Sequence, residues 1–80
     1  MSDELREEAH DVEVTVWVGK NGIEAVVDEL QDQLRNETLV KVKFLRSARG
    51  TDDTETLAGE LADRVNAELI ETRGHTAVLH

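Results

Sequence analysis

The chain has 80 residues, a formal net charge of −9 and no cysteine. This length suits one domain, residues 1–80, and the lack of cysteine excludes disulfide bonds and thiolate metal sites. The N-terminus is acidic and no apolar run approaches about 18 residues, which excludes a secretory signal and a membrane span. We therefore expect a cytoplasmic protein with no membrane partner.

The first segments are expected to be a short helix and a strand. Residues 2–9 are rich in helix-forming side chains but have only a thin apolar face. Residues 12–18 alternate strictly, which predicts a half-buried strand. Its buried face should hold Val12, Val14, Val16 and Val18, and its other face Glu13, Thr15 and Trp17.

A helix and a second strand are expected next. In residues 23–36 apolar residues recur at i, i+3, i+4, i+7 and i+11, which predicts an amphipathic helix that starts directly after Gly22. Residues 39–45 alternate again. This pattern points Val40, Val42 and Phe44 to the core and Lys41 and Lys43 to solvent.

The second half of the chain predicts a turn, a helix and a hairpin. Residues 47–53 have turn composition, and Asp52 with Glu55 fits a capping box for a helix that runs to about Asn66. Two apolar runs, residues 67–72 and 76–79, are joined by Arg73-Gly74-His75, which is typical of a tight hairpin turn.

The predicted order is α-β-α-β-α-β-β, an α/β fold. Right-handed strand-helix-strand connections place both long helices on one face of the sheet. The other face should stay partly open and carry Trp17, Lys41 and Lys43.

The tetrapeptide Gly19-Lys20-Asn21-Gly22 joins the first strand to the helix that follows. Its glycines leave backbone N–H groups unhindered beside the positive end of that helix, so the turn suits a phosphate. KH-type RNA-binding modules clamp a nucleic-acid backbone with the same G-x-x-G spacing. Strand-to-helix turns that bind nothing also use glycines, so the tetrapeptide alone leaves both interpretations open.

Basic residues are concentrated between Thr38 and Thr51, a segment without acids. Alternating lysines on a strand can simply discourage edge-to-edge pairing, or form an ordinary solvated face. In a chain with 18 acids and 9 bases, however, this clustering favours contact with a polyanion. The cations concerned are Lys41, Lys43, Arg46 and Arg49, to which Arg73 and His75 of the last turn could add a donor and an aromatic ring.

The polar residues indicate neither a metal site nor an enzyme. His10, His75 and His80 fit no metal-ligand spacing, and serine occurs only at positions 2 and 47. We find no set of nucleophile, general base and orienting group. The sequence therefore predicts a non-catalytic protein without cofactor, metal or small-molecule substrate.

Three separated segments resemble a known family. They are VWVGKNGI (residues 16–23), ETLVKVKF (residues 37–44) and AELIETRGHTAVL (residues 67–79), with Leu61-Ala62 before the last. In this order they are similar to the CRM domain (chloroplast RNA splicing and ribosome maturation), and more narrowly to stand-alone YhbY-like proteins. The resemblance covers residues 12–79.

This resemblance implies an RNA-binding domain with a four-stranded mixed sheet and helices packed against it. It is related in fold to the C-terminal domain of bacterial translation initiation factor three. The resemblance also implies rRNA in precursors of the large ribosomal subunit as the partner, with ribosomal proteins as further partners. Carried over by position, it places the G-x-x-G loop at residues 19–22, the basic strand at Lys41 and Lys43, and the last turn at residues 73–75.

The chain departs from this family in two features besides a shorter N-terminal helix. Many relatives are basic and end in Leu-Tyr-Arg, whereas this chain is acidic and ends in Leu79-His80. Many acids, few lysines and only two aromatics are similar to the composition of salt-adapted proteins, so the chain resembles a haloarchaeal member. In molar salt the Debye length falls to about 3 Å, so only close contacts to RNA would count.

We therefore expect a non-catalytic RNA-binding protein. The residues expected to contact RNA are Gly19, Lys20, Asn21, Gly22, Lys41, Lys43, Arg46, Arg49, Arg73 and His75. The alternative is a protein-interaction adaptor that docks through the open sheet face around Trp17.

Overall fold

The computed structural model describes residues 7–80. Residues 7–9 are helical, and the rest of the predicted N-terminal helix lies outside the described residues. The elements that follow are β1 (Val14–Val18), the 3-10 helix η1 (Ile23–Val26), α2 (Val27–Asn36), β2 (Val40–Phe44), α3 (Arg46–Arg49), α4 (Thr54–Val65), β3 (Leu69–Arg73) and β4 (Thr76–Leu79).

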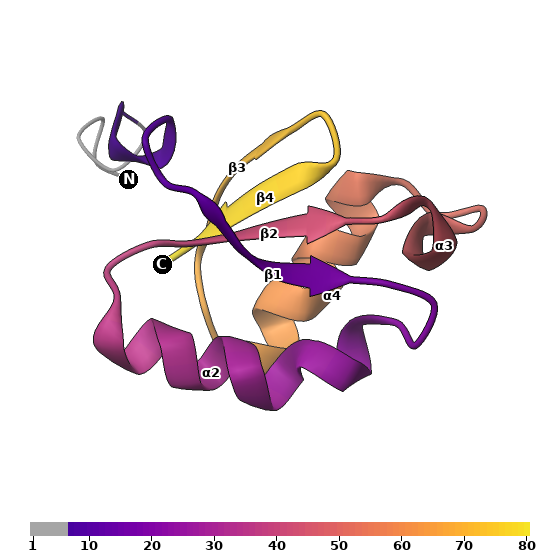
Figure 1. Ribbon diagram of the computed structural model, residues 1–80, viewed down its shortest axis with the longest axis horizontal. Coiled ribbons are helices and arrows are strands. Elements are labelled where there is room, and N and C mark those ends of the chain that lie inside the picture. Colours follow the sequence, from indigo (N-terminus) through magenta and orange to yellow (C-terminus); the bar gives the residue numbers. More distant parts are fainter. Residues whose placement is uncertain (1–6) are drawn as a thin grey trace.

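The strands form one mixed sheet in the order β1-β2-β4-β3 (Figure 1). β1 and β2 are parallel, because α2 carries the chain back between them. β4 pairs antiparallel with both β2 and β3, and the predicted hairpin of the last two strands is present. The predicted α/β fold with a four-stranded mixed sheet is confirmed.

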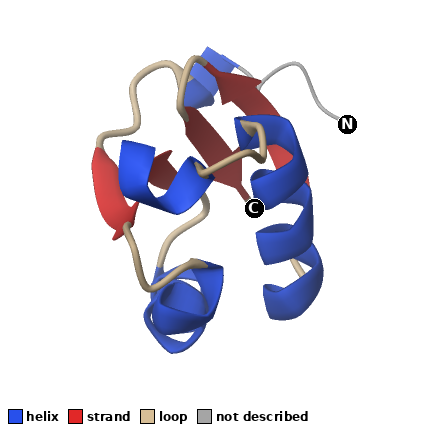
Figure 2. Ribbon diagram, turned by 90° about the vertical axis from the view of Figure 1, so that its right-hand side faces the viewer, coloured by secondary structure: helices blue, strands red, loops and turns tan. Residues whose placement is uncertain are grey.

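Both long helices, α2 and α4, lie on one face of this sheet and contact each other (Figure 2). The main core lies between these helices and the sheet. No helix within residues 7–80 has the length and hydropathy to cross a membrane. The largest fully buried side chains of the main core are Phe44, Leu30, Leu61, Leu79, Val16, Val18, Val40 and Val42.

A second, smaller cluster lies on the opposite face of the sheet. In β4, Ala77 and Leu79 are buried in the main core, so Val78 between them points the other way. Val78 packs there with Ala9, which lies in the helical turn of residues 7–9. The N-terminal segment therefore covers part of the face that the helices leave open.

A β-bulge at Thr15 changes which valines face the helices. The register of β1 shifts between Val14 and Val16, so Thr15 is an extra residue. Val16 and Val18 are fully buried in the main core, whereas Val12 packs in the second cluster. The prediction that four valines share one face is therefore wrong for Val12 and for Val14, which lies beside Lys41, because one extra residue reverses the alternation. Thr15, predicted on the face of Trp17, instead donates from Oγ1 to Gln33 of α2.

The segment between β2 and α4 contains a helix where the sequence predicts only a turn. In α3 the Leu45 carbonyl accepts from the N–H groups of Ala48 (2.9 Å) and Arg49 (3.3 Å). Gly50, with φ 49°, ends the helix. Four residues cannot show a helical apolar period, so the sequence contains no signal for α3.

α4 starts one residue later than the predicted capping box. The Asp53 Oδ1 accepts from the Thr56 N–H at 2.7 Å, whereas the predicted cap, Asp52, donates its own N–H to Arg49 in the preceding turn. Hydrogen bonds from Thr56 lower the pKa of Asp53 below the ordinary 3.8, and the Thr56 side chain contributes more to this shift than its backbone N–H. The helix ends as predicted at Asn66, which adopts a left-handed conformation (φ 56°).

Candidate nucleic-acid interface

Residues 19–22 form a tight turn after β1. The Gly22 N–H donates to the Gly19 carbonyl at 3.0 Å, so this N–H is used within the turn. Gly22 has φ 78° and ψ −176°, a conformation that is open almost only to glycine. Lys20 and Asn21 lie exposed at the tip, where their side chains can reach a ligand.

The helix after this turn is not α-helical at its start. Ala25 donates to the Gly22 carbonyl at 3.4 Å, an i→i+3 bond of the 3-10 helix η1, and α2 begins only at Val27. The expectation of an α-helix directly after Gly22 is therefore wrong. No side chain caps the start of η1. The carbonyl of Gly22, directly before η1, accepts from the Ala25 N–H. Lys20 and the N–H groups at the tip are then the main candidates for a phosphate contact.

The G-x-x-G turn and α3 are neighbours at one edge of the sheet, because the parallel strands β1 and β2 end there together (Figure 1). The Leu45 N–H donates to the Val18 carbonyl at 2.9 Å and joins the two strand ends. A methyl group on Gly19 would lie 3.8 Å from Leu45 Cδ1 and from Ser47 Oγ. Arg46, exposed at the start of α3, therefore extends the surface of the turn.

The β3–β4 turn reaches the same edge, because β4 runs antiparallel to β2. The Phe44 N–H donates to the His75 carbonyl at 2.8 Å, and the His75 Nδ1 lies 3.5 Å from the Thr54 Oγ1 at the start of α4. Arg49 donates from Nε to the Phe44 carbonyl at 3.3 Å. His75 thus joins the β3–β4 turn to β2 and α4, and Arg49 joins α3 to β2. The bond of Arg49 engages only one of its three guanidinium nitrogens.

The open face of the sheet carries a row of laterally paired residues, here called the cross-strand row. Trp17 of β1 lies beside Lys43 of β2, Lys43 beside Thr76 of β4, and Thr76 beside Arg73 of β3. Trp17 is 53% exposed, and Lys43 and Arg73 are exposed as well. Lys41 is half-buried on the same face. The prediction that Trp17, Lys41 and Lys43 share the open face is confirmed.

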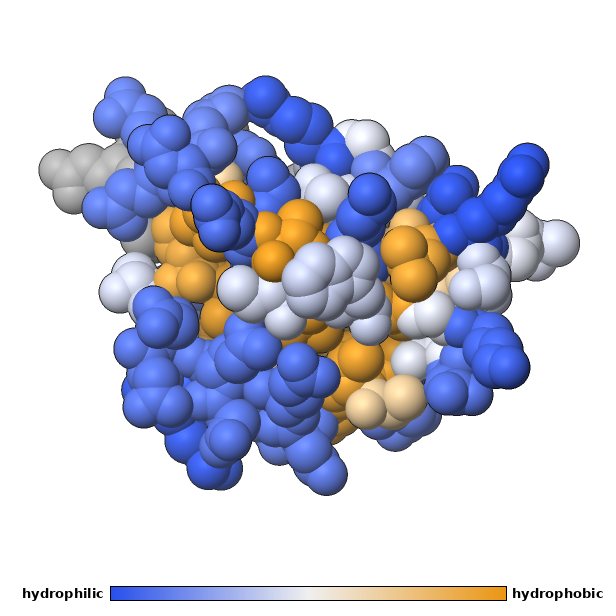
Figure 3. Space-filling view, viewed as in Figure 1, coloured by the Kyte–Doolittle hydropathy of each residue, from blue (hydrophilic) through white to orange (hydrophobic). Residues whose placement is uncertain are grey.

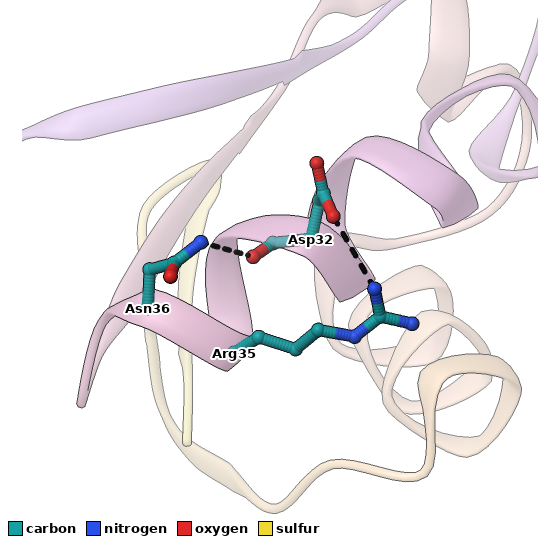
Figure 4. A network of polar contacts seen from close by, with 3 residues as sticks. All are labelled: Asp32, Arg35 and Asn36. Carbon is teal, nitrogen blue, oxygen red and sulfur yellow. Dashed lines mark hydrogen bonds and ion pairs between the residues drawn. The ribbon is translucent and has the colours of Figure 1, made fainter.

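The basic residues of this region do not pair with carboxylates of the described residues. The ion pairs within residues 7–80 are Arg35–Asp32 at 3.4 Å and Arg64–Glu24. Figure 4 shows the first pair at the end of α2, where Asn36 also donates to the Asp32 carbonyl at 3.1 Å. Neither pair includes a cation from residues 38–51, so within the described part of the chain these cations are available to an anion.

Two hollows of the surface are lined by acids. The larger, about 800 Å³, lies between the start of β1 and the end of α2. Figure 3 shows this side, with apolar side chains in a band between hydrophilic surfaces. A smaller one of about 380 Å³ lies beside α3 and the β3–β4 turn. The acids lining them are Glu13, Glu29, Asp32 and Glu37 in the first, and Asp52, Asp53 and Glu55 in the second. Arg49 and His75 also line the second, so acids and bases meet there, whereas the first is lined by acids without a base and suits a phosphate backbone least.

Three residues of this region were not predicted as site residues. The Ser47 Oγ lies beside the turn, Thr76 belongs to the cross-strand row, and the His10 Nε2 lies 3.5 Å from the Arg73 Nη2. The alternation of β4 could have placed Thr76 on the face of Val78. No sequence signal connects His10 to Arg73, because the contact joins distant parts of the chain.

We expect the two glycines of the turn to respond differently to alanine. Gly22→Ala places a side chain at φ 78° and should lower the free energy of unfolding by about 1–3 kcal/mol. Gly19→Ala meets only ordinary contacts at 3.8 Å, and should change it by less than about 0.5 kcal/mol. Urea denaturation followed by circular dichroism measures both, and equal losses would contradict the described turn geometry.

Comparison with known proteins identifies relatives. The model of the CRS1 / YhbY (CRM) domain matches residues 2–80. A protein of Methanocaldococcus jannaschii, named a probable RNA-binding protein, is 40% identical over 75 residues. This match covers 94% of the chain but 56% of the relative, so the chain spans about half the length of that protein.

A solved structure is similar as well. The solution structure of a Staphylococcus aureus protein, described as a candidate for RNA binding, has a TM-score of 0.80 and 32% sequence identity to this chain. The similarity covers 98% of this chain and 80% of that one. The family model spans nearly the whole chain and the fold agrees, which confirms the resemblance of the three segments. The chain belongs to the CRS1/YhbY (CRM) domain family.

Proposed function

We propose that this chain is a non-catalytic RNA-binding protein. The observation that carries the proposal is that the G-x-x-G turn, α3 and the β3–β4 turn meet at one edge of the sheet, beside the open face with Lys41 and Lys43. Membership of the CRS1/YhbY family and the names of the two relatives support it.

In this proposal the edge holds the RNA backbone. Lys20 and the backbone N–H groups at the tip of the turn contact one phosphate, and Asn21 donates to a neighbouring phosphate or sugar oxygen. Arg46 and Arg49 continue the contact along α3, and Lys43 continues it onto the sheet. Because backbone contacts position RNA without reading its bases, sequence preference from this edge is low.

The net charge of −9 is compatible with this interface, because the charges are segregated. The acid-free segment of residues 38–51 supplies the cations, and the acids gather at hollows such as the one beside the end of α2. At 0.15 M salt the Debye length is about 8 Å, and near 1 M it is about 3 Å. Added salt therefore weakens repulsion from distant acids more than it weakens the direct contacts.

We further propose that the RNA is ribosomal and that the protein acts in the cytoplasm during assembly of the large subunit. The resemblance to stand-alone YhbY-like proteins supports this finer proposal. In this finer proposal residues 1–80 act as one RNA-binding domain. Ribosomal proteins are its expected neighbours on the assembling large subunit.

Crosslinking tests both levels of the proposal. Ultraviolet crosslinking of the purified chain to oligouridine, followed by mass spectrometry, should place crosslinks in residues 17–22, 41–49 and 73–76. Crosslinks mainly in residues 28–37 would contradict the interface. In cells, sequencing of crosslinked RNA should enrich large-subunit rRNA, and enrichment of messenger RNA alone would overturn only the ribosomal part.

A further inference from the structure

We propose that Trp17 stacks on an unpaired base of the bound RNA, so that the open sheet face accepts single-stranded RNA while the edge holds its backbone. This inference rests on the proposed RNA binding and adds the strandedness of the ligand to it. Bases in a duplex have their faces covered by neighbouring pairs, whereas an unpaired base offers a free face to an aromatic ring.

The exposure of Trp17 is the first observation. Its neighbours Val16 and Val18 are fully buried on the helix side, while the indole is 53% exposed on the open face. Trp17 and Phe44 are the aromatic side chains of the chain, and Phe44 is fully buried in the core. Trp17 thus presents a large flat apolar surface to solvent where no core packing requires it.

The cross-strand row supplies the matching charges. Lys43 lies directly beside Trp17, and Arg73 ends the row three strand spacings away, about 14 Å at roughly 4.8 Å per spacing. Thr76, between the two cations, donates from Oγ1 to the Arg73 carbonyl at 2.8 Å. An aromatic platform with cations beside it matches a nucleotide, because the ring takes the base and the cations take the phosphates.

The position of Trp17 also fits the turn. It precedes Gly19 by two residues, or about 7 Å of strand. The second cluster with Ala9 and Val78 covers a neighbouring part of the same face, so the open part lies beside the basic edge. A backbone phosphate on the turn would therefore leave its base over Trp17.

A protein partner on the same face is the competing occupant. An apolar protein surface that covered Trp17 would also bury Lys43. Removing the Lys43 ammonium group from water would be costly unless the partner supplied carboxylates. The paired row contains two cations, Lys43 and Arg73, and the acid Glu71 of the same face is half-buried beside Val78, outside the row. The two cations complement a phosphate backbone, and RNA is therefore the occupant that the row favours.

The chain's single tryptophan makes the test direct, because its emission reports on Trp17 alone. Single-stranded oligouridine should quench the emission with the same midpoint as binding measured by anisotropy of the labelled RNA. Inorganic polyphosphate, which has no bases, should bind without quenching. A blunt RNA duplex of equal length should bind more weakly and quench less.

Substitutions separate stacking from charge. Trp17→Ala should weaken binding of oligouridine about 5- to 140-fold, which corresponds to about 1–3 kcal/mol for one stacked base at 1.4 kcal/mol per tenfold. Its affinity for polyphosphate should stay unchanged, and Trp17→Phe should keep most of the oligouridine affinity. The matched control, Lys43→Ala, should lower the affinity for both oligouridine and polyphosphate. The quenching of Trp17 emission at saturation with oligouridine should stay the same.

The outcomes distinguish this inference from the proposed function. If wild type binds oligouridine without a change in emission, or if Trp17→Ala binds it normally, stacking is wrong and RNA binding stands. If Trp17→Ala keeps its RNA affinity but loses association with nuclease-treated ribosomal proteins, the face is a protein dock. If wild type binds no RNA in about 0.15 M or about 1 M KCl, where the Debye length is about 8 Å or about 3 Å, both proposals fail.

Discussion

The double variant Lys20→Asp, Asn21→Asp is expected to bind single-stranded RNA roughly 10- to 140-fold more weakly than wild type. The substitution removes two donors from the exposed tip of the turn and places two carboxylates there. A hydrogen bond to a charged group is worth about 1.5–3 kcal/mol, which gives this range at 1.4 kcal/mol per tenfold. Fluorescence anisotropy at about 0.15 M and about 1 M KCl measures the loss at Debye lengths of about 8 Å and about 3 Å.

The end of α2 offers a matched control. Arg35→Asp, Asn36→Asp makes the same change of charge, with an arginine in place of the lysine, at a pair that is exposed and bonded only to Asp32 of its own helix (Figure 4). The control variant should lose less than half as much binding free energy for RNA as the Lys20→Asp, Asn21→Asp variant loses. If both variants bind like wild type, or lose affinity equally, the turn has no special part in holding RNA.

Phe44→Ala is expected to lower the free energy of unfolding by about 3–5 kcal/mol. Phe44 is fully buried in the main core at the end of β2, and its removal leaves a cavity between the sheet and the helices. At 0.05–0.15 kcal/mol per residue, a chain of this length is stable by about 4–12 kcal/mol, so the variant should lose from about a quarter of its stability to all of it. Urea denaturation followed by circular dichroism gives the difference.

The neighbouring residue provides the comparison for this prediction. Lys43 lies next to Phe44 in β2 but points to the open face and is exposed. Lys43→Ala should change the free energy of unfolding by less than about 0.5 kcal/mol. A loss for Lys43→Ala as large as that for Phe44→Ala would mean that β2 is not oriented as described.

The parts of the fold that follow a long period could be predicted from sequence. β2, with alternating burial, and the two long helices with their apolar stripes were predicted, as was the hairpin around Gly74. Features that depend on a single residue could not be predicted from sequence. The bulge at Thr15 depends on how β1 pairs with β2, and the cap of α4 was assigned to Asp52 because two adjacent aspartates both satisfy the local pattern.

The candidate site was predictable to a similar extent. The turn, the lysines of β2 and the last turn were chosen separately, and the sheet topology brings them to one edge and one face. Their role as RNA contacts stays a prediction. The contacts of Arg49 with Phe44 and of His75 with Thr54 could not be foreseen, because they depend on α3 and on the packing of α4.

Charge is separated along β1, although the acids Asp52, Asp53 and Glu55 also lie beside α3. The acidic hollow lies where β1 begins, and the basic turn follows its end, on a body whose longest extent is 33 Å. A polyanion approaching from the acidic side is repelled, while the field turns the protein so that its basic edge leads. In the proposed function, acids far from the interface would thus act on the rate of association with RNA, because they shorten encounters on the wrong side.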